Sequence, residues 1–193
     1  IANTTGSENV AVGYYAMKAH TTGINNTAVG KASLYWNTTG GYNTAIGKDA
    51  LSSNTTASYN TAVGDSSMLA NTTGANNAAI GYFSLKTNTT ASDNVAFGSY
   101  ALNTNNGSFN TSLGKSSMYA NTTGEKNTAV GNDALRTNTT SSASTAVGWA
   151  ALYSSTGSHN TAVGYEALRD NTTAQYSTAV GVAALTDNTT GTK

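Results

Sequence analysis

A motif of about 17 residues repeats eleven times along the chain, and this repeat constrains the fold more than any other feature. Its consensus is N-T-A-V-G-x-x-A-L-x-x-N-T-T-G-x-x, and one glycine marks the same place in every copy. These marker glycines are 17 residues apart, except for two intervals of 16: Gly13, Gly30, Gly47, Gly64, Gly81, Gly98, Gly114, Gly131, Gly148, Gly164 and Gly181. A fixed period of this kind is typical of stacked-repeat architectures, so we interpret residues 1–193 as a single repeat domain, part of a longer fibre.

Two rows of the repeat are apolar in every copy, while the positions around them vary. The residue before the marker glycine is always large and apolar, and the fourth residue after it is always Leu or Met. Constant apolar rows among variable polar rows indicate a repeated interior. We therefore expect the core to include residues of the first row and residues of the second: Val29, Ile46, Val63, Val130 and Val163, then Leu34, Leu51, Leu135 and Leu152.

The repeat favours short β-strands over helices. Its apolar pieces are brief and are separated by Asn, Thr and Gly, which are poor in helix interiors and common in turns. The fold class predicted is all-β, a parallel β-solenoid or β-roll of about eleven 17-residue coils. Both shortened intervals fall in turn segments, at residues 103–108 and 153–158, where a deletion leaves the faces of the strands unchanged.

The interior expected from these rows is thin for a free-standing domain. In the strand N-T-A-V-G, we expect Thr and Val to point inward and Ala and Gly to form a smooth outer face. A smooth face of small residues suggests that another copy of the chain packs against it. We expect a homotrimer around a threefold axis, with a self-sufficient single-chain solenoid as the alternative.

Composition excludes several classes of protein. Nine basic and nine acidic residues give a net charge of zero, so nothing favours binding to nucleic acid. The chain has no cysteine and no apolar run long enough to span a membrane, so we expect no disulfide and no membrane insertion by this segment. No catalytic, metal-binding or cofactor-binding constellation recurs, and we expect both histidines, His20 and His159, to be exposed. We therefore expect a protein that is not an enzyme and holds no cofactor.

The strand motif is similar to that of a known group of fibres. "NTAVG", "NTAIG" and "NNAAIG" resemble the head repeats of YadA-like trimeric autotransporter adhesins, and resemble still more the N-T-A-I-G arrays of phage tail fibres and other bacterial surface fibres. The resemblance extends over the chain from Asn9 onward, although this repeat is longer than the adhesin repeat and mostly carries Thr where the adhesin has Val. It implies a left-handed, trimeric, extracellular and adhesive β-roll.

Two sets of residues are candidates for contact with partners. Aromatic residues at variable, outward positions suit a sugar or a protein receptor, or else pair across strands to stabilise the roll: Tyr35, Trp36, Tyr42, Tyr59, Trp149 and Tyr165. The Asn-Thr-Thr segments match the N-glycosylation sequon, or else form a ladder of stacked Asn side chains: Asn37, Asn54, Asn71, Asn88, Asn121, Asn138, Asn171 and Asn188.

These features favour a structural and adhesive segment of an extracellular fibre, in a virion tail fibre or on a cell surface. Its expected partners are other copies of itself and a host surface glycan or protein receptor. A glycosylated filament subunit is one alternative. An ice-binding solenoid is another, because rows of threonine on a flat face can order water.

Overall fold

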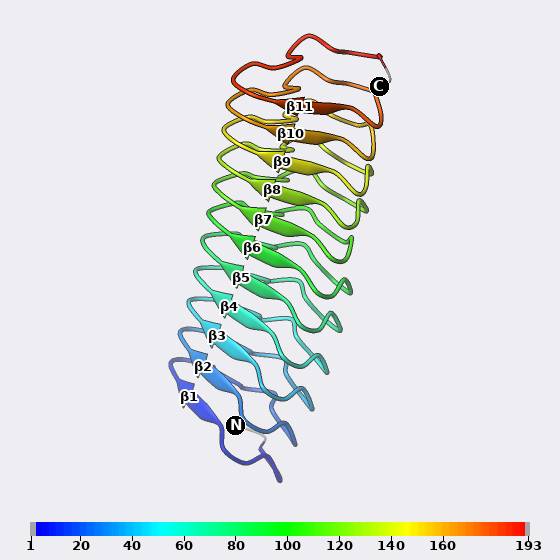
Figure 1. Ribbon diagram of the computed structural model, residues 1–193. Coiled ribbons are helices and arrows are strands. Elements are labelled where there is room, and N and C mark those ends of the chain that lie inside the picture. The colour runs from blue at the N-terminus through cyan, green and yellow to red at the C-terminus, as the bar shows by residue number, and fades with distance from the viewer. Residues whose placement is uncertain (1–2, 192–193) are drawn as a thin grey trace.

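The computed structural model describes residues 3–191 as a β-solenoid, a rod of stacked coils (Figure 1). Eleven three-residue strands form one parallel sheet, and their order in space follows the sequence. The strands are β1 (Val10–Val12), β2 (Thr27–Val29), β3 (Thr44–Ile46), β4 (Thr61–Val63), β5 (Ala78–Ile80), β6 (Val95–Phe97), β7 (Thr111–Leu113), β8 (Thr128–Val130), β9 (Thr145–Val147), β10 (Thr161–Val163) and β11 (Thr178–Val180). The predicted fold class is confirmed, except that residues 1–2 and 192–193 lie outside the described range. Within that range, no helix could cross a membrane.

Neighbouring strands pair in strict register, so equivalent residues of successive repeats lie side by side. In β3 and β4, for example, Thr44 pairs with Thr61 and Ile46 with Val63. The same register continues through both 16-residue intervals, between β6 and β7 and between β9 and β10. The missing residue is therefore absorbed in the turns, as the sequence predicts, because a slip of one residue in a strand would exchange its two faces.

The interior is filled by one Leu or Met and two small side chains from each coil. The central residue of each strand, nearly always Ala, is fully buried from β2 to β10. The Leu or Met four residues after the marker glycine is also buried as far as Leu168, which confirms this part of the predicted core: Leu34, Leu51, Leu135 and Leu152. A buried Ala or Ser directly before that residue is the second small side chain, as at Ala50 and Ser67.

The large apolar residue before the marker glycine points outward, so its assignment to the core is wrong. Val29, Val63 and Val130 are only half-buried, and Ile46 and Val163 are 40% and 37% exposed. Side chains alternate along a strand, so an inward alanine places both of its neighbours on the outer surface. Alanine is the inward residue because the Leu and two asparagine side chains of each coil already share the narrow cross-section, and a larger strand residue would not fit.

The corners of the coils use left-handed backbone conformations. The buried Leu or Met of each coil has a φ of 47–52°. This conformation costs about 1–2 kcal/mol, and full burial of such a side chain contributes about 1.5–3 kcal/mol, so burial offsets the strain. The marker glycines have φ of 130–141°. A Cβ on Gly47 would lie 2.4 Å from the carbonyl oxygen of Gly64 in the next coil, so close stacking requires glycine there.

Replacing Leu135 with alanine tests the position of the core. We expect the free energy of unfolding to fall by about 2–5 kcal/mol, because the variant leaves a cavity between two coils. Leu185 occupies the same row but is 55% exposed in the last coil, so Leu185→Ala is the matched control and should cost less than about 1 kcal/mol. Equal losses in urea denaturation would contradict the assigned interior.

Candidate binding surfaces

Two columns of asparagine run through the interior of the rod. The turn column contains the Asn of each Asn-Thr-Thr segment and its equivalents, and the strand column contains the Asn that precedes each strand. The buried members of the turn column are His20, Asn37, Asn54, Asn71, Asn88, Asn105, Asn121, Asn138, Ser155 and Asn171. The buried members of the strand column are Asn26, Asn43, Asn60, Asn77, Asn94, Asn110, Asn127, Ser144, Asn160 and Ser177.

Hydrogen bonds join the columns from coil to coil. In the turn column, Asn54 Nδ2 donates to Asn37 Oδ1 at 2.9 Å. In the strand column, the backbone N–H and the Nδ2 of Asn43 both donate to Asn26 Oδ1, at 3.0 and 3.1 Å. The columns also meet each other, because Asn43 Nδ2 and Asn54 Nδ2 both donate to the carbonyl oxygen of Ala57. The predicted ladder of Asn side chains is therefore confirmed, and it lies inside the coil.

This burial is incompatible with N-glycosylation of the buried asparagines in the folded coil. The candidate sites from Asn37 to Asn171 have no exposed surface, and a glycan on Nδ2 would displace a hydrogen bond and the neighbouring coil. Of the two alternatives for these segments, the burial of Asn37 to Asn171 therefore favours the ladder. Asn188 is partly exposed in the last coil, where its Nδ2 donates to the carbonyl oxygen of Gly191 at 3.2 Å.

The turn column is interrupted where the repeat is one residue short. Asn88 Oδ1 and both side-chain polar atoms of Asn171 are buried without a hydrogen-bond partner. Beside Asn88, the Nδ2 of Asn105 donates instead to the carbonyl oxygen of Gly107. Beside Asn171, the column carries Ser155, whose hydroxyl donates to the carbonyl oxygen of Gly157. Both shortened turns therefore keep the strand register and lose continuity in the turn column.

The two histidines have different environments. His20 takes the place of an Asn in the turn column and is 1% exposed, so its expected position on the surface is wrong. Its Nε2 donates to the carbonyl oxygen of Gly23 at 2.9 Å, and its Nδ1 accepts from Asn37 Nδ2 at 3.1 Å. His159 is exposed, as expected, and stacks on Tyr176 with ring centroids 4.9 Å apart. Within residues 3–191, no group of three or more His, Cys, Asp or Glu side chains is placed to hold a metal ion.

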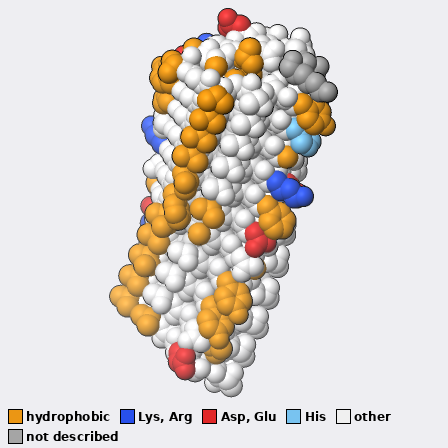
Figure 2. All heavy atoms as spheres, viewed as in Figure 1, with side chains coloured by type: hydrophobic (Ala, Val, Ile, Leu, Met, Phe, Trp, Pro, Cys, Tyr) orange, Lys and Arg blue, Asp and Glu red, His pale blue; other side chains and the backbone are white. Residues whose placement is uncertain are grey.

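The outer face of the sheet carries a continuous apolar band, which we call the aliphatic stripe. It consists of the residue before each marker glycine: Val12, Val29, Ile46, Val63, Ile80, Phe97, Leu113, Val130, Val147, Val163 and Val180. Every member is half-buried or exposed, and Figure 2 shows hydrophobic side chains in a band that follows the rod over the strands. A second row on the same face is mostly threonine, two residues before the stripe in each strand, and is half-buried from Thr27 to Thr161.

The six aromatic candidates form three separate pairs. Tyr42 and Tyr59 are exposed and stack in parallel, with centroids 5.1 Å apart. Tyr35 meets Trp36 edge to face at 4.7 Å, and Trp149 stacks on Tyr165 at 5.0 Å. All three pairs therefore show the stabilising aromatic contacts that were the alternative to partner binding. In the second pair, a hydrogen bond to the Tyr35 hydroxyl raises the pKa of Lys18 above its ordinary value.

Trp149 of the third pair borders a hollow of about 430 Å³ that lies beyond the C-terminal ends of β8, β9 and β10. Its walls include two ion pairs from the coils on either side. Asp133 binds Arg136 at 3.2 Å, and Glu166 binds Arg169 at 2.8 Å. The coil between them contributes Trp149, Ala150 and Tyr153. Hydrogen bonds to Asp170 and Glu166 raise the pKa of Arg169 above its ordinary value, so this guanidinium stays charged.

The two ion pairs of this hollow were not singled out from the sequence. A signal for them exists, since the spacing acid-x-x-Arg occurs at Asp133 and again at Glu166, in the same rows of two repeats that enclose a third. Isolated charges in variable rows are common on protein surfaces, and only the stacking of coils shows that these pairs face a shared space.

Comparison with protein-family models, with curated proteins and with solved structures found no match. The fold therefore defines the class of this chain as a tandem-repeat β-solenoid of parallel stacked coils.

Replacing Asn60 tests the strand column. In Asn60→Leu, the backbone N–H of Asn77 loses its acceptor, so we expect the free energy of unfolding to fall by about 1–3 kcal/mol. Asn60→Ser is the matched control, because Ser144 in the same column accepts from the backbone N–H of Asn160 at 3.3 Å. The serine variant should retain more stability than the leucine variant in urea denaturation. The opposite order would show that apolar packing outweighs the hydrogen bonds of this column.

Proposed function

We propose that this chain is a structural and adhesive segment of an extracellular fibre, in which three copies assemble through their aliphatic stripes. The observation that carries the proposal is the unbroken length of the stripe, which runs through all eleven strands on the outer face of the sheet. Single exposed apolar residues are normal on a soluble protein, whereas a continuous apolar band marks an interaction surface.

The dimensions of the stripe suit contact between copies of the chain. Ten spacings of about 4.8 Å give a length of about 50 Å. With a width of about 10 Å, two facing stripes would bury about 1,000 Å², which is near the lower bound for a specific interface. A neighbouring copy has the same repeat and the same coil spacing, so its residues would interlock at every coil. In a threefold arrangement each chain would make two such contacts.

This arrangement moves the interface from where the sequence placed it. The smooth face of alanine that was expected to meet another copy lies inside the coil, and the apolar residues expected inside form the outer surface. Self-association therefore remains our proposal, on the face that carries the stripe and the threonine row. The function in a virion tail fibre or a cell-surface adhesin is supported by the resemblance of the repeat motif and by the rod shape, which holds a binding surface at a distance.

A second candidate uses the same face. The threonine row points outward beside the stripe at a regular coil spacing, so the face presents a flat lattice of hydroxyl and methyl groups. Such a lattice can order water, which favours the ice-binding alternative. Self-association would bury this face, whereas ice binding requires it to be exposed to water, so one face cannot serve both functions at once. Thermal hysteresis by a monomeric chain would support ice binding.

Charged substitutions in the stripe test the fibre proposal. We expect wild-type protein to have the mass of three chains in native mass spectrometry. The double variant Val63→Asp and Val130→Asp should have the mass of one chain, because two carboxylates per chain would be buried without partners. Both side chains point outward, so its circular dichroism should still be that of the folded coil.

The matched control carries the same charges on another part of the coil. Thr56 and Thr123 are exposed in the turns, and the double variant Thr56→Asp and Thr123→Asp should assemble as wild type does. A single-chain mass for the wild type, or assembly that survives the stripe substitutions, would overturn the proposed interface.

A further inference from the structure

The hollow beside Trp149 is a shaped space whose lining combines aromatic, acidic and basic side chains. Positive and negative side chains occupy the same two rows in the coils of β8 and β10, two coil spacings or about 10 Å apart. In the coil of β9, the corresponding rows carry Ala150 and Tyr153. The small Ala150 leaves space between the ion pairs of the two flanking coils. The volume of the hollow, about 430 Å³, lies within the range of small-molecule sites.

The geometry points to this hollow as a binding site for a neutral saccharide of one or two pyranose rings. The inference deepens the adhesive function proposed above and rests on it, since it names the class of receptor that the fibre would contact. Three properties of the hollow carry it: an aromatic ring at its edge, paired donors and acceptors along its walls, and an almost balanced charge.

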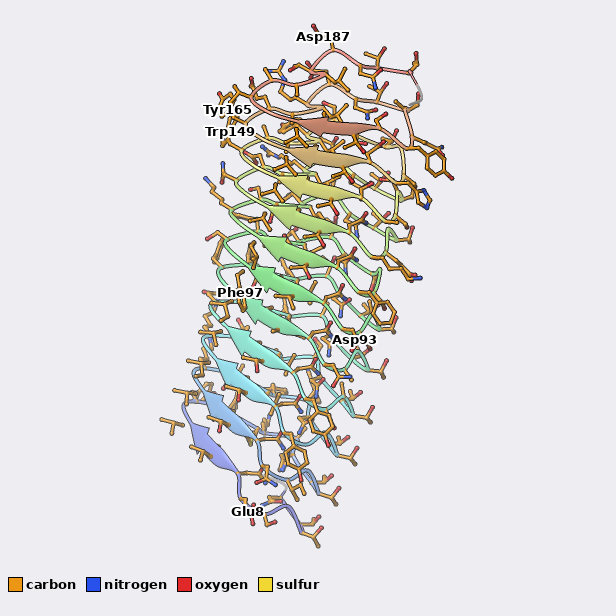
Figure 3. The ribbon with its side chains drawn as sticks, viewed as in Figure 1. Glu8, Asp93, Phe97, Trp149, Tyr165 and Asp187 are labelled. Atoms are coloured by element: carbon orange, nitrogen blue, oxygen red, sulfur yellow. The ribbon has the colours of Figure 1, made fainter. Side chains whose placement is uncertain are left out.

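The aromatic edge is the indole of Trp149, which lines the hollow and is 43% exposed. Tyr165 stacks on it with an interplanar angle of 15° and does not itself line the hollow, so it supports the indole from the neighbouring coil. Figure 3 shows both side chains on the same edge of the rod, at successive coils. A rigid, partly exposed ring gives a large contact area at low entropic cost, and it matches the C–H face of a sugar.

The polar walls match hydroxyl groups, which both donate and accept hydrogen bonds. Arg136 is fixed by Asp133 and has its guanidinium 5.9 Å from the ring of Tyr153. Arg169 is fixed by Glu166 and by Asp170, the latter at 2.9 Å. A guanidinium has five N–H donors and a carboxylate about four acceptor positions, so each ion pair keeps free donors and acceptors side by side. Groups already held in place lose little freedom when a ligand binds.

The charge of the hollow selects a neutral ligand. Three carboxylates and two guanidinium groups line it, and each arginine is already paired with an acid. An anionic ligand would meet a net negative lining, and a cationic ligand would have to compete with two fixed arginines. Hydroxyl groups can use the free donors and acceptors without breaking either pair.

Fluorescence can detect binding at this site alone. The chain has two tryptophans, so Trp36→Phe leaves Trp149 as the only indole. We expect at least one of the methyl glycosides of glucose, galactose, mannose and N-acetylglucosamine to change the fluorescence emission of Trp149 in a saturable manner. Asp133→Asn and Arg169→Gln should each weaken that binding about tenfold, as expected for a residue at the centre of a contact. In Trp149→Leu, saturation-transfer NMR should show loss of binding.

The matched control is the other exposed stacked pair. Tyr42→Ala with Tyr59→Ala removes two rings in the row of Asp93, at the opposite edge of the rod in Figure 3, and should leave binding unchanged. The proposal is overturned if no neutral glycoside gives saturable binding, if binding survives Trp149→Leu, or if glucuronate or glucosamine binds more tightly than every neutral glycoside. Native mass spectrometry of the same samples tests the fibre proposal separately. A trimer that binds no glycoside would overturn the saccharide site and leave the fibre proposal standing. A single chain that binds a glycoside would overturn the proposed trimer and leave the saccharide site standing.

Discussion

Coil-to-coil hydrogen bonding by buried asparagine is the interaction on which the rest of the structure depends. Each side-chain amide carries donors and an acceptor, so one residue type can bond to its own copy in the coil before it and the coil after it. A buried amide without partners would be costly, and the identical neighbour supplies those partners at every level. This requirement explains why the same letters recur every 17 residues. Where a turn is one residue short, polar atoms are left unpaired: the Nδ2 of Asn105 turns away from Asn88, and Ser155 takes the place of the Asn that would precede Asn171.

The asparagine columns also determine which strand residues lie on the outer surface. Because they share the interior with a Leu and small residues, the strand contributes only alanine inward, and its large apolar residue must point out. The chain thus has a polar and apolar mixture inside and a continuous apolar stripe outside, the reverse of a simple amphipathic strand. A stripe of this length is unusual on an isolated rod, and the self-association that we propose would cover it. The hollow beside Trp149 lies in the segment after the strands, where rows vary freely and a local site can arise without disturbing the stacking.

The sequence predicted the features that follow from periodicity and failed on those that depend on the direction of side chains. The 17-residue spacing identified parallel coils, the Leu row and the two shortened turns, because these follow from which positions are constant. The predicted inward direction of the Val row was wrong, because the alternation of side chains assigns two faces to a strand and does not say which face is buried. Hydrophobicity suggested the valine, whereas hydrogen-bonded asparagines filled the interior, as at Asn43 and Asn60. The sequence predicted the turn column as a ladder and did not predict the strand column. His20 was expected on the surface because its neighbours in sequence are polar. The hollow could not be predicted without the stacking distance between coils.

Hydrogen exchange of the asparagine side-chain amides, followed by NMR, tests the central claim most directly. Asn25 and Asn76 are outward-facing and partly or fully exposed, and they serve as references within the same molecule. If the columns stabilise the rod from within, the Nδ2 protons of Asn43, Asn60 and Asn77 should exchange at least about 100-fold more slowly than those of the two references, because exchange then requires coils to open. Exchange of all five side chains at the same rate would show that the asparagines are in contact with water, and the account of the interior would be wrong.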